Sequence, residues 1–350
     1  MKKIAVVGIV GIPACYGGFE SLVENLTANS GDGISYLVFC SSKEYKVKLN
    51  SHNNASLIYL PIKANGVWSV IYDILSLFKC LFLKPDVILV LGVSGSVFLP
   101  IFKFFSKCKV ITNIDGLEWK RDKWGKGARR FLKWSESLAV KHSDIIVTDN
   151  QAITDYVLKE YALESKTISY GGDHAIRALT LTAKSEDFSL ALCRIEPENN
   201  IAMILDAFSN SNLKLKFVGN WGSSEFGRVM RSKYSSFENI QLLDPIYDLD
   251  ELYKLRANCS LYIHGHSAGG TNPSLVEMMH FGVPILAFDC DFNRFSTKDS
   301  AHYFKNSEEL LTLLSFDKKD ELAENAEAMK NIALECYTWE KVRNSYETLY

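Results

Sequence analysis

Short apolar runs alternate with longer amphipathic stretches along the whole chain. Short runs rich in β-branched residues predict buried strands, and the stretches between them have the three-to-four-residue apolar spacing of helices. The expected strands are Lys3–Val7, Ser35–Phe39, Leu57–Leu60, Val87–Leu91, Val110–Thr112, Ile145–Val147, Ser189–Leu192, Lys214–Val218, Ile240–Leu242, Leu261–His264 and Ile285–Ala287. Strands that alternate with helices are typical of βα units around parallel sheets. The pattern predicts an α/β protein made of two Rossmann-like halves.

The chain has 350 residues, which exceeds the size at which one hydrophobic core usually stops growing. Two domains are therefore expected, and we place their boundary at the sequence Tyr170-Gly171-Gly172-Asp173. The first domain is then 1–170.

Composition excludes several classes of protein. A net charge of −2 with 12% aromatic residues excludes intrinsic disorder and a generally basic nucleic-acid-binding surface. Eight scattered cysteines without a C-x-x-C pair favour reduced thiols in a cytoplasmic protein. The longest uncharged stretch, Val87–Phe102, has 16 residues, fewer than the ~20 that span a bilayer, so no transmembrane helix is expected.

Charge is distributed unevenly between the halves. Residues 1–170 hold 21 basic and 15 acidic residues (+6), which leaves 18 and 26 (−8) for 171–350. Lys120–Lys133 alone contributes seven bases and one acid. Clustered cations among tryptophans favour an anionic membrane surface, although a solvated helix facing the acidic half is the alternative. The predicted membrane and acceptor patch comprises Trp119, Lys120, Arg121, Lys123, Trp124, Lys126, Arg129, Arg130 and Lys133.

Two glycine-rich turns lead from a strand into a helix. The first, Gly8–Glu20, follows the first strand, and the second, Gly265–Met279, follows Leu261–His264. Backbone N–H groups at such a turn favour phosphate, although the first turn is equally well a tight βα connection. Neither the dinucleotide fingerprint nor the Walker pattern is present.

Three charged residues are candidates for binding or catalysis. Glu277, one helical turn into the second motif, could accept hydrogen bonds from a ribose diol, with a solvated helix face as the alternative. Arg194 is a natural partner for a diphosphate, or else forms an interdomain salt bridge. Asp115 follows the strand Val110–Thr112 at the carboxyl edge of the sheet and is the candidate catalytic residue; a turn or helix-capping aspartate is the alternative. Asp289-Cys290-Asp291 imitates a metal-binding D-x-D motif, but we expect no metal and no cofactor.

Four separated motifs together resemble a known family. They are Gly11–Glu20, Ile114–Trp124, Arg194–Asn200 and His264–Glu277, and they occur in the order found in bacterial rhamnosyltransferases of surface and capsular polysaccharide synthesis, related to glycosyltransferase family 4. The resemblance implies a GT-B fold with two Rossmann-like domains facing a cleft. It also implies that 171–335 binds the nucleotide-sugar, and that 336–350 is a helix packing back on the N-terminal, acceptor-side domain.

The resemblance assigns roles to individual residues. Glu277 would bind the ribose, and Arg194 would neutralise the diphosphate. Gly270 and Thr271 would supply backbone donors, and Gly17 and Gly18 would close over the donor from the first domain. Two departures stand out: Gly269 replaces the first glutamate of the family pattern, and Asn199 replaces its phosphate lysine, so His264 or His266 is expected to meet part of the donor charge. The expected donor-binding residues are Gly17, Gly18, Arg194, Asn199, His266, Gly270, Thr271, Asn272 and Glu277.

These observations predict a retaining glycosyltransferase. It would transfer a deoxyhexose, L-rhamnose from dTDP-rhamnose, to a lipid-linked saccharide in surface polysaccharide synthesis, at the inner face of the plasma membrane and without nucleic acid. The alternatives are a nucleotide-sugar epimerase of the same two-domain plan, or a non-catalytic scaffold subunit that binds sugar nucleotides.

Overall fold

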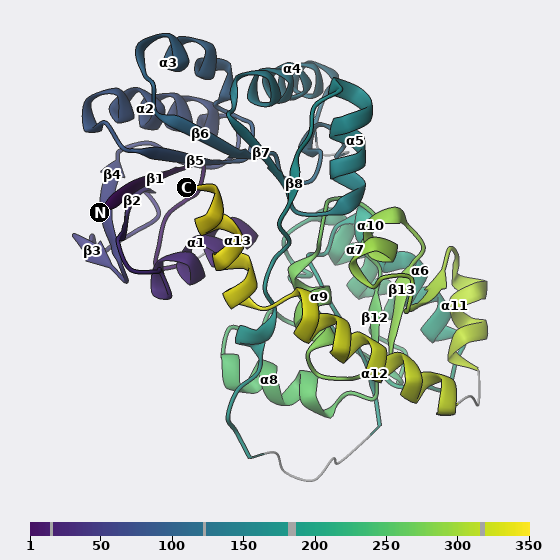
Figure 1. Cartoon of the computed structure of the whole chain (residues 1–350). Helices are drawn as coiled ribbons and strands as arrows, with labels where there is room; N and C mark the ends of the chain where they lie inside the picture. The colour runs from purple at the N-terminus through teal and green to yellow at the C-terminus, as the bar shows by residue number, and fades with distance from the viewer. Residues whose placement is uncertain (15–16, 122–123, 181–186, 316–318) are drawn as a thin grey trace. The chain divides into compact units, whose positions relative to one another are not determined.

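The computed structural model describes residues 1–14, 17–121, 124–180, 187–315 and 319–350. The chain divides into two compact units (Figure 1). The first unit consists of Met1–Tyr170 together with Trp339–Tyr350, and the second is Gly171–Thr338.

The first unit is built on an eight-stranded sheet of order β3-β4-β2-β1-β5-β6-β7-β8. The strands are β1 (Lys2–Val7), β2 (Ile34–Ser41), β3 (Ser51–His52), β4 (Ala55–Leu60), β5 (Val87–Leu91), β6 (Lys109–Asn113), β7 (Ile145–Thr148) and β8 (Lys166–Thr167). Its helices are α1 (Gly18–Ala28), α2 (Trp68–Leu83), α3 (Leu99–Phe105), α4 (Lys126–His142), α5 (Gln151–Tyr161) and α13 (Trp339–Leu349), with 3-10 turns η1 (Ser96–Phe98) and η2 (Glu118–Lys120). The pairings are parallel except that of β3 with β4.

Helices cover both faces of this sheet. Figure 1 shows α2, α3 and α4 on one side and α1 and α13 on the other. The central strands are consequently buried on both faces, which explains why Val87–Leu91 is an unbroken apolar run rather than an alternating one. The returning helix α13 is fixed by buried contacts: Tyr346 Oη accepts from Asn113 Nδ2 at 2.8 Å, and the Gly31 N–H donates to Glu347 at 2.8 Å.

The second unit contains a six-stranded parallel sheet of order β11-β10-β9-β12-β13-β14. Its strands are β9 (Ser189–Leu192), β10 (Leu215–Val218), β11 (Ile240–Leu243), β12 (Leu261–His264), β13 (Ile285–Phe288) and β14 (His302–Phe304). Its helices are α6 (Ile201–Ser209), α7 (Glu225–Tyr234), α8 (Leu249–Asn258), α9 (Pro273–Met279), α10 (Asp291–Ser296), α11 (Ser307–Leu314) and α12 (Lys319–Cys336), with 3-10 turns η3 (Asp173–Ala175) and η4 (Pro197–Asn199). Buried aromatic side chains of Phe208, Phe217, Trp221 and Phe304 fill much of its core.

The predicted α/β fold with two parallel sheets is confirmed. Each of the eleven expected strands has a counterpart, whereas the short edge strands β3, β8 and β14 are not marked by an apolar run. The resemblance placed the start of the final helix at residue 336; α12 instead continues to Cys336, and α13 begins at Trp339.

Candidate active site

The two predicted donor loops of the second unit meet where its strand order reverses. β9 and β12 are neighbours in the sheet, but the chain leaves them toward opposite edges, to β10 and to β13. In open α/β sheets such a switch point forms a ligand crevice at the carboxyl ends of the strands. The loops that follow β9 and β12 contain Arg194–Asn200 and Gly265–Asn272.

Hydrogen bonds tie these two loops together. The Ser267 N–H and hydroxyl both donate to the Glu198 carbonyl, at 3.1 and 2.6 Å, and Asn200 Nδ2 donates to the Gly265 carbonyl at 2.8 Å. A side chain at position 265 would place its Cβ 2.3 Å from the Asn199 carbonyl oxygen, so glycine permits this close approach. Residues about 70 positions apart therefore form one surface.

Glu277 lies on α9 and is mostly buried, so the solvated-face alternative is wrong. Its carboxylate forms ion pairs with the buried Arg256 of α8 and with His174 Nε2 at 3.4 Å. Burial opposes ionisation, but the Arg256 guanidinium and the contact with His174 outweigh it and hold the pKa of Glu277 below its ordinary value. The carboxylate is therefore charged at neutral pH.

Gly172 brings His174 to this carboxylate. A Cβ at position 172 would lie 2.5 Å from the Val276 carbonyl oxygen, so the segment that enters the second unit touches the backbone of α9. The Gly172 N–H also donates to the Tyr337 carbonyl at 2.8 Å, which fixes its position. Neither His174 nor Arg256 could be predicted from the sequence, since both reach Glu277 only through tertiary contacts.

Arg194 and Asn199 have different environments. Arg194 exposes about half of its side chain (54%) and lies 3.8 Å from Glu196. Asn199 is buried, and its Nδ2 donates to the Arg194 carbonyl at 2.7 Å. The Asn199 amide thus braces the loop that carries Arg194 and does not present its N–H to a ligand here.

His264 cannot supply the positive charge that was expected of it. Its ring is buried between those of Tyr262 and His266, with both centroid distances 5.9 Å. Burial lowers the pKa of His264 to about 3, so the imidazole is neutral at physiological pH. That expectation is wrong because a buried, uncompensated imidazolium is too costly. His266 is less buried, and its carbonyl accepts from Asn293 Nδ2 at 2.8 Å.

The turn before α9 contains the remaining expected donor contacts. Gly269 adopts φ +118°, a conformation that a glutamate rarely takes, and Gly270 follows it. Thr271 is buried. Asn272 is the N-cap of α9, and its Oδ1 accepts from the Ser274 N–H at 3.0 Å and the Ser274 hydroxyl at 2.7 Å. The side-chain oxygen of Asn272 is therefore used to cap α9.

In the first unit, Glu20 already occupies donors of the first glycine-rich turn. Its carboxylate accepts from the Val10 N–H at 2.8 Å and from the Gly17 N–H at 2.9 Å, which caps α1. The Gly17 N–H is therefore engaged by the buried carboxylate of Glu20, and a donor contact at Gly17 stays a prediction. Gly18 is the first residue of α1.

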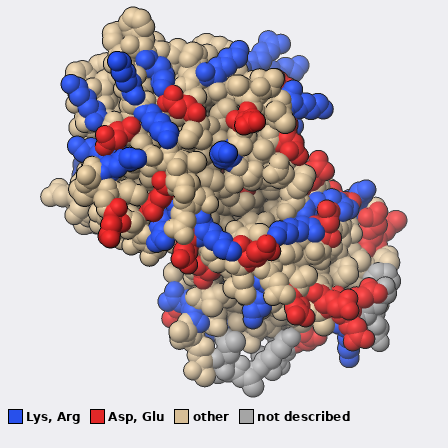
Figure 2. All heavy atoms as spheres, in the orientation of Figure 1, with Lys and Arg blue, Asp and Glu red and all other residues tan. Residues whose placement is uncertain are grey.

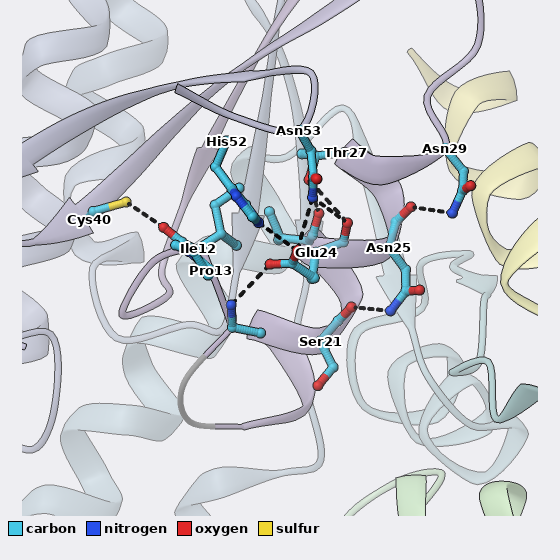
Figure 3. A network of polar contacts seen from close by, with 12 residues as sticks. Ile12, Pro13, Ser21, Glu24, Asn25, Thr27, Asn29, Cys40, His52 and Asn53 are labelled. Atoms are coloured by element: carbon cyan, nitrogen blue, oxygen red, sulfur yellow. Dashed lines mark hydrogen bonds and ion pairs between the residues drawn. The ribbon is translucent and has the colours of Figure 1, made fainter. Parts of the chain in front are cut away.

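Glu24, one helical turn after Glu20 on α1, contacts the same turn (Figure 3). It accepts from the Ala14 N–H at 2.9 Å and from Asn53 Nδ2 at 2.9 Å, and it pairs with His52 at 2.6 Å. The turn after β1 is therefore braced by two glutamates of α1.

Asp115 lies two residues beyond the end of β6, as expected for a residue at the carboxyl edge. Its backbone has φ +60°, and its N–H donates to Asn113 Oδ1 at 3.0 Å. Asp115 lies in the loop between β6 and η2, and Leu117, not Asp115, occupies the N-cap position of η2.

The basic segment is partly internal. Arg121 pairs with Glu118 at 2.9 Å, Arg129 Nε donates to the Trp124 carbonyl at 2.9 Å, and Lys133 pairs with Glu160 at 3.0 Å. The side chains of these three cations are only partly exposed. Among the described basic residues of the segment, Lys120, Lys126 and Arg130 are exposed. Lys123 lies outside the described residues. A hollow of about 550 Å³ is lined by Trp119, Arg129, Arg130, Lys133, Trp134 and Tyr161 among others.

The D-x-D imitation is engaged in ion pairs. Asp289 contacts Arg294 at 2.5 Å and Lys305 at 3.3 Å. Among the residues that the structure describes, no group of three or more His, Cys, Asp or Glu side chains is placed to hold a metal ion.

Comparisons with known families match the two halves of the chain separately. Residues 174–331 are similar to the family "Glycosyl transferases group 1", and residues 1–173 to "Domain of unknown function (DUF1972)". The segments Arg194–Asn200 and Gly265–Asn272 lie within the range of the first match. No match was found among curated proteins.

Solved structures with the same fold include three enzymes or complexes. Sucrose-phosphate synthase from Thermosynechococcus elongatus has 13% identity and a TM-score of 0.83, over 100% of this chain and 98% of that one. The structure of Anabaena Alr3699/HepE in complex with UDP-glucose has 14% identity and a TM-score of 0.75, over 100% of this chain and 99% of that one. A glycosyltransferase from Rickettsia africae ESF-5 has 12% identity and a TM-score of 0.73, over 100% of this chain and 97% of that one. The likeness to these structures shows that the fold is GT-B.

Proposed function

We propose that this protein is a retaining glycosyltransferase that transfers L-rhamnose from dTDP-rhamnose to a lipid-linked saccharide in surface polysaccharide synthesis. One observation carries the transferase proposal. The exposed Arg194 lies in the loop after β9, and the charged Glu277 lies on α9, which follows the loop after β12, so both belong to segments that leave the switch point of the second sheet. The rhamnose assignment is supported by the four ordered motifs, and the nucleotide-sugar class by the group 1 domain.

In the proposed reaction the bond between the anomeric carbon and the diphosphate oxygen breaks, and that carbon bonds to an acceptor hydroxyl. Glu277 holds the ribose hydroxyls of the donor, and Arg194 stabilises the negative charge that develops on the departing diphosphate. The hydroxyl proton passes to the diphosphate. We assign to Asp115 the orientation of the acceptor hydroxyl.

A donor panel tests the proposal. Thermal unfolding is measured with dTDP-rhamnose, UDP-glucose, UDP-galactose and a GDP-sugar, since a ligand at 100 times its Kd adds about 2.7 kcal/mol to the free energy of unfolding. We expect dTDP-rhamnose to stabilise most and to be consumed when a lipid-linked acceptor is added, with retention at the anomeric carbon by NMR. Turnover of a UDP-sugar in its place would overturn the sugar assignment alone.

The same panel separates the alternatives. An epimerase interconverts sugars without an acceptor, and a scaffold binds the donor but neither hydrolyses nor transfers it. Either result would overturn the transferase proposal.

A further inference from the structure

Helix α2 is apolar on two faces, and one of them is exposed. Its inward side chains include the buried Tyr72, Leu77 and Cys80. The exposed side chains recur every three or four residues and therefore share a face: Trp68, Ile71, Leu75, Phe78 and Phe82. Phe82 is 71% exposed and Trp68 57%. An amphipathic surface helix would have polar residues at these positions.

Helix α3 extends this surface. The two helices are in contact, and α3 exposes Ile101, Phe104 (83%) and Phe105 (69%). The ring centroid of Phe78 lies 5.3 Å from that of Phe82 and 6.5 Å from that of Phe98, in the turn that leads into α3. The α2–α3 face is defined by the eight exposed apolar residues of these two neighbouring helices, and an exposed apolar surface of this kind marks an interaction site.

The charges around the α2–α3 face are mostly positive. Residues 66–85 and 96–107 contain four lysines, and their single acidic residue, Asp73, is buried. Two exposed acids lie nearby: Asp144 pairs with Lys103 at 2.7 Å, and Asp86 follows α2. The lysines are Lys79, Lys84, Lys103 and Lys107. The neighbouring α4 adds exposed Lys126, Arg130 and Trp134. Figure 2, in the orientation of Figure 1, shows basic side chains over the upper part of the first unit, with acidic side chains among them.

We propose that the α2–α3 face docks on an anionic lipid leaflet. Aromatic side chains would enter the interfacial zone while the lysines contact acidic headgroups. α2 has 16 residues, so it would lie along the leaflet and not cross it. The functional role of this docking rests on the proposed function, in which the acceptor is a lipid-linked saccharide held in the same leaflet.

Charge favours a leaflet over a second copy of the chain. In a two-fold dimer the same patch meets itself, so the lysines around one face would oppose those around the other. Lysine is also depleted at protein–protein interfaces, whereas an anionic leaflet attracts it.

Vesicle flotation without donor or acceptor tests the docking surface, so its outcome does not depend on the sugar assignment. Wild-type protein should float with phosphatidylcholine vesicles that contain phosphatidylglycerol. Changing Phe78, Phe82, Phe104 and Phe105 to Ser should reduce partitioning at least about tenfold, because buried aromatic area supplies the binding energy. Val229→Ser with Leu249→Ser, at exposed apolar positions of the second unit, is the matched control and should float like wild type. Unchanged thermal midpoints show that each variant is folded.

The lysines and Trp68 give two further readouts. Reversing Lys79 and Lys107 to Glu should weaken binding at low salt by roughly fivefold or more per lysine, with a smaller effect at high salt. Lipids brominated in the acyl chains should quench Trp68, and Trp68→Phe should lose that part of the quenching. The proposal is overturned if wild-type protein does not float, if the four-fold serine variant floats equally well, or if sedimentation shows a lipid-free dimer that this variant converts to monomers.

Discussion

The guanidinium of Arg256 on α8 and the carboxylate of Glu277 on α9 form a mostly buried ion pair. His174 approaches the same carboxylate from the segment that enters the second unit. Because a carboxylate has about four acceptor sites, Glu277 keeps capacity for a ribose diol while its charge and orientation are fixed in advance. The proposed donor contact is therefore preorganised by two residues outside the motif.

Arg256→Met should destabilise the second unit by about 3 kcal/mol, since it leaves a mostly buried carboxylate without its main partner. Adding Glu277→Gln should restore part of that loss by removing the charge. Urea unfolding of the single and double variants measures both effects. If the double variant is as unstable as the sum of the two single ones, the pair is not coupled.

Glu277→Gln and Arg194→Ala should each lower kcat/KM about 10- to 100-fold, because hydrogen bonds to charged groups contribute roughly 1.5–3 kcal/mol. The control is Arg228→Ala, a similarly exposed arginine of the second unit that pairs with Glu225. Steady-state kinetics with the donor identified by the panel provide the measurement. Wild-type kcat/KM in both site variants would assign these residues a purely structural role.

Asp73 should make the stability of the first unit depend on pH. Burial raises the pKa of Asp73 from 3.8 to about 7, although a hydrogen bond from Ser94 opposes this. Between these values the folded state binds more protons than the unfolded state, so stability falls as pH rises. Asp73→Asn should remove this decline. Urea unfolding at several pH values from 4 to about 8 tests the prediction; identical slopes for the two proteins would contradict it.

Gly265→Ala should separate the two donor loops. Its Cβ would meet the Asn199 carbonyl oxygen at 2.3 Å, and backbone cannot yield as a flexible side chain does. We expect a loss of about 1–3 kcal/mol in stability and weaker donor binding. Gly222→Ala, whose Cβ would have Asn220 Oδ1 at 3.9 Å as its nearest contact, is the control for a tolerated glycine. Calorimetric titration with donor and thermal unfolding distinguish the two variants.

Much of the fold could be predicted from local patterns. Val87–Leu91, Ser189–Leu192 and Leu261–His264 coincide with observed strands, because a parallel strand buried on both faces must be continuously apolar. The short strands β3 and β8 lack that signal, since two-residue edge strands bury little.

The candidate site was predicted less completely. The loops containing Arg194 and Glu277 were found because a turn at the carboxyl end of a strand is visible in the sequence. The roles of individual side chains could not be predicted from the sequence. Asn199 braces its own loop, Asn272 caps α9, and Glu20 occupies the Gly17 N–H, and each of these choices depends on which donors and acceptors lie within reach after folding.

The positions of strands, helices and glycine-rich turns follow from local patterns in the chain, because apolar periodicity and glycine act over a few residues. The contacts of Arg256 and His174 with Glu277, the neutral state of His264 and the exposed apolar face of α2 arise only on folding. Burial and charge pairing depend on which distant segments the strand order brings together. Local sequence patterns do not show that order, because it depends on the whole fold.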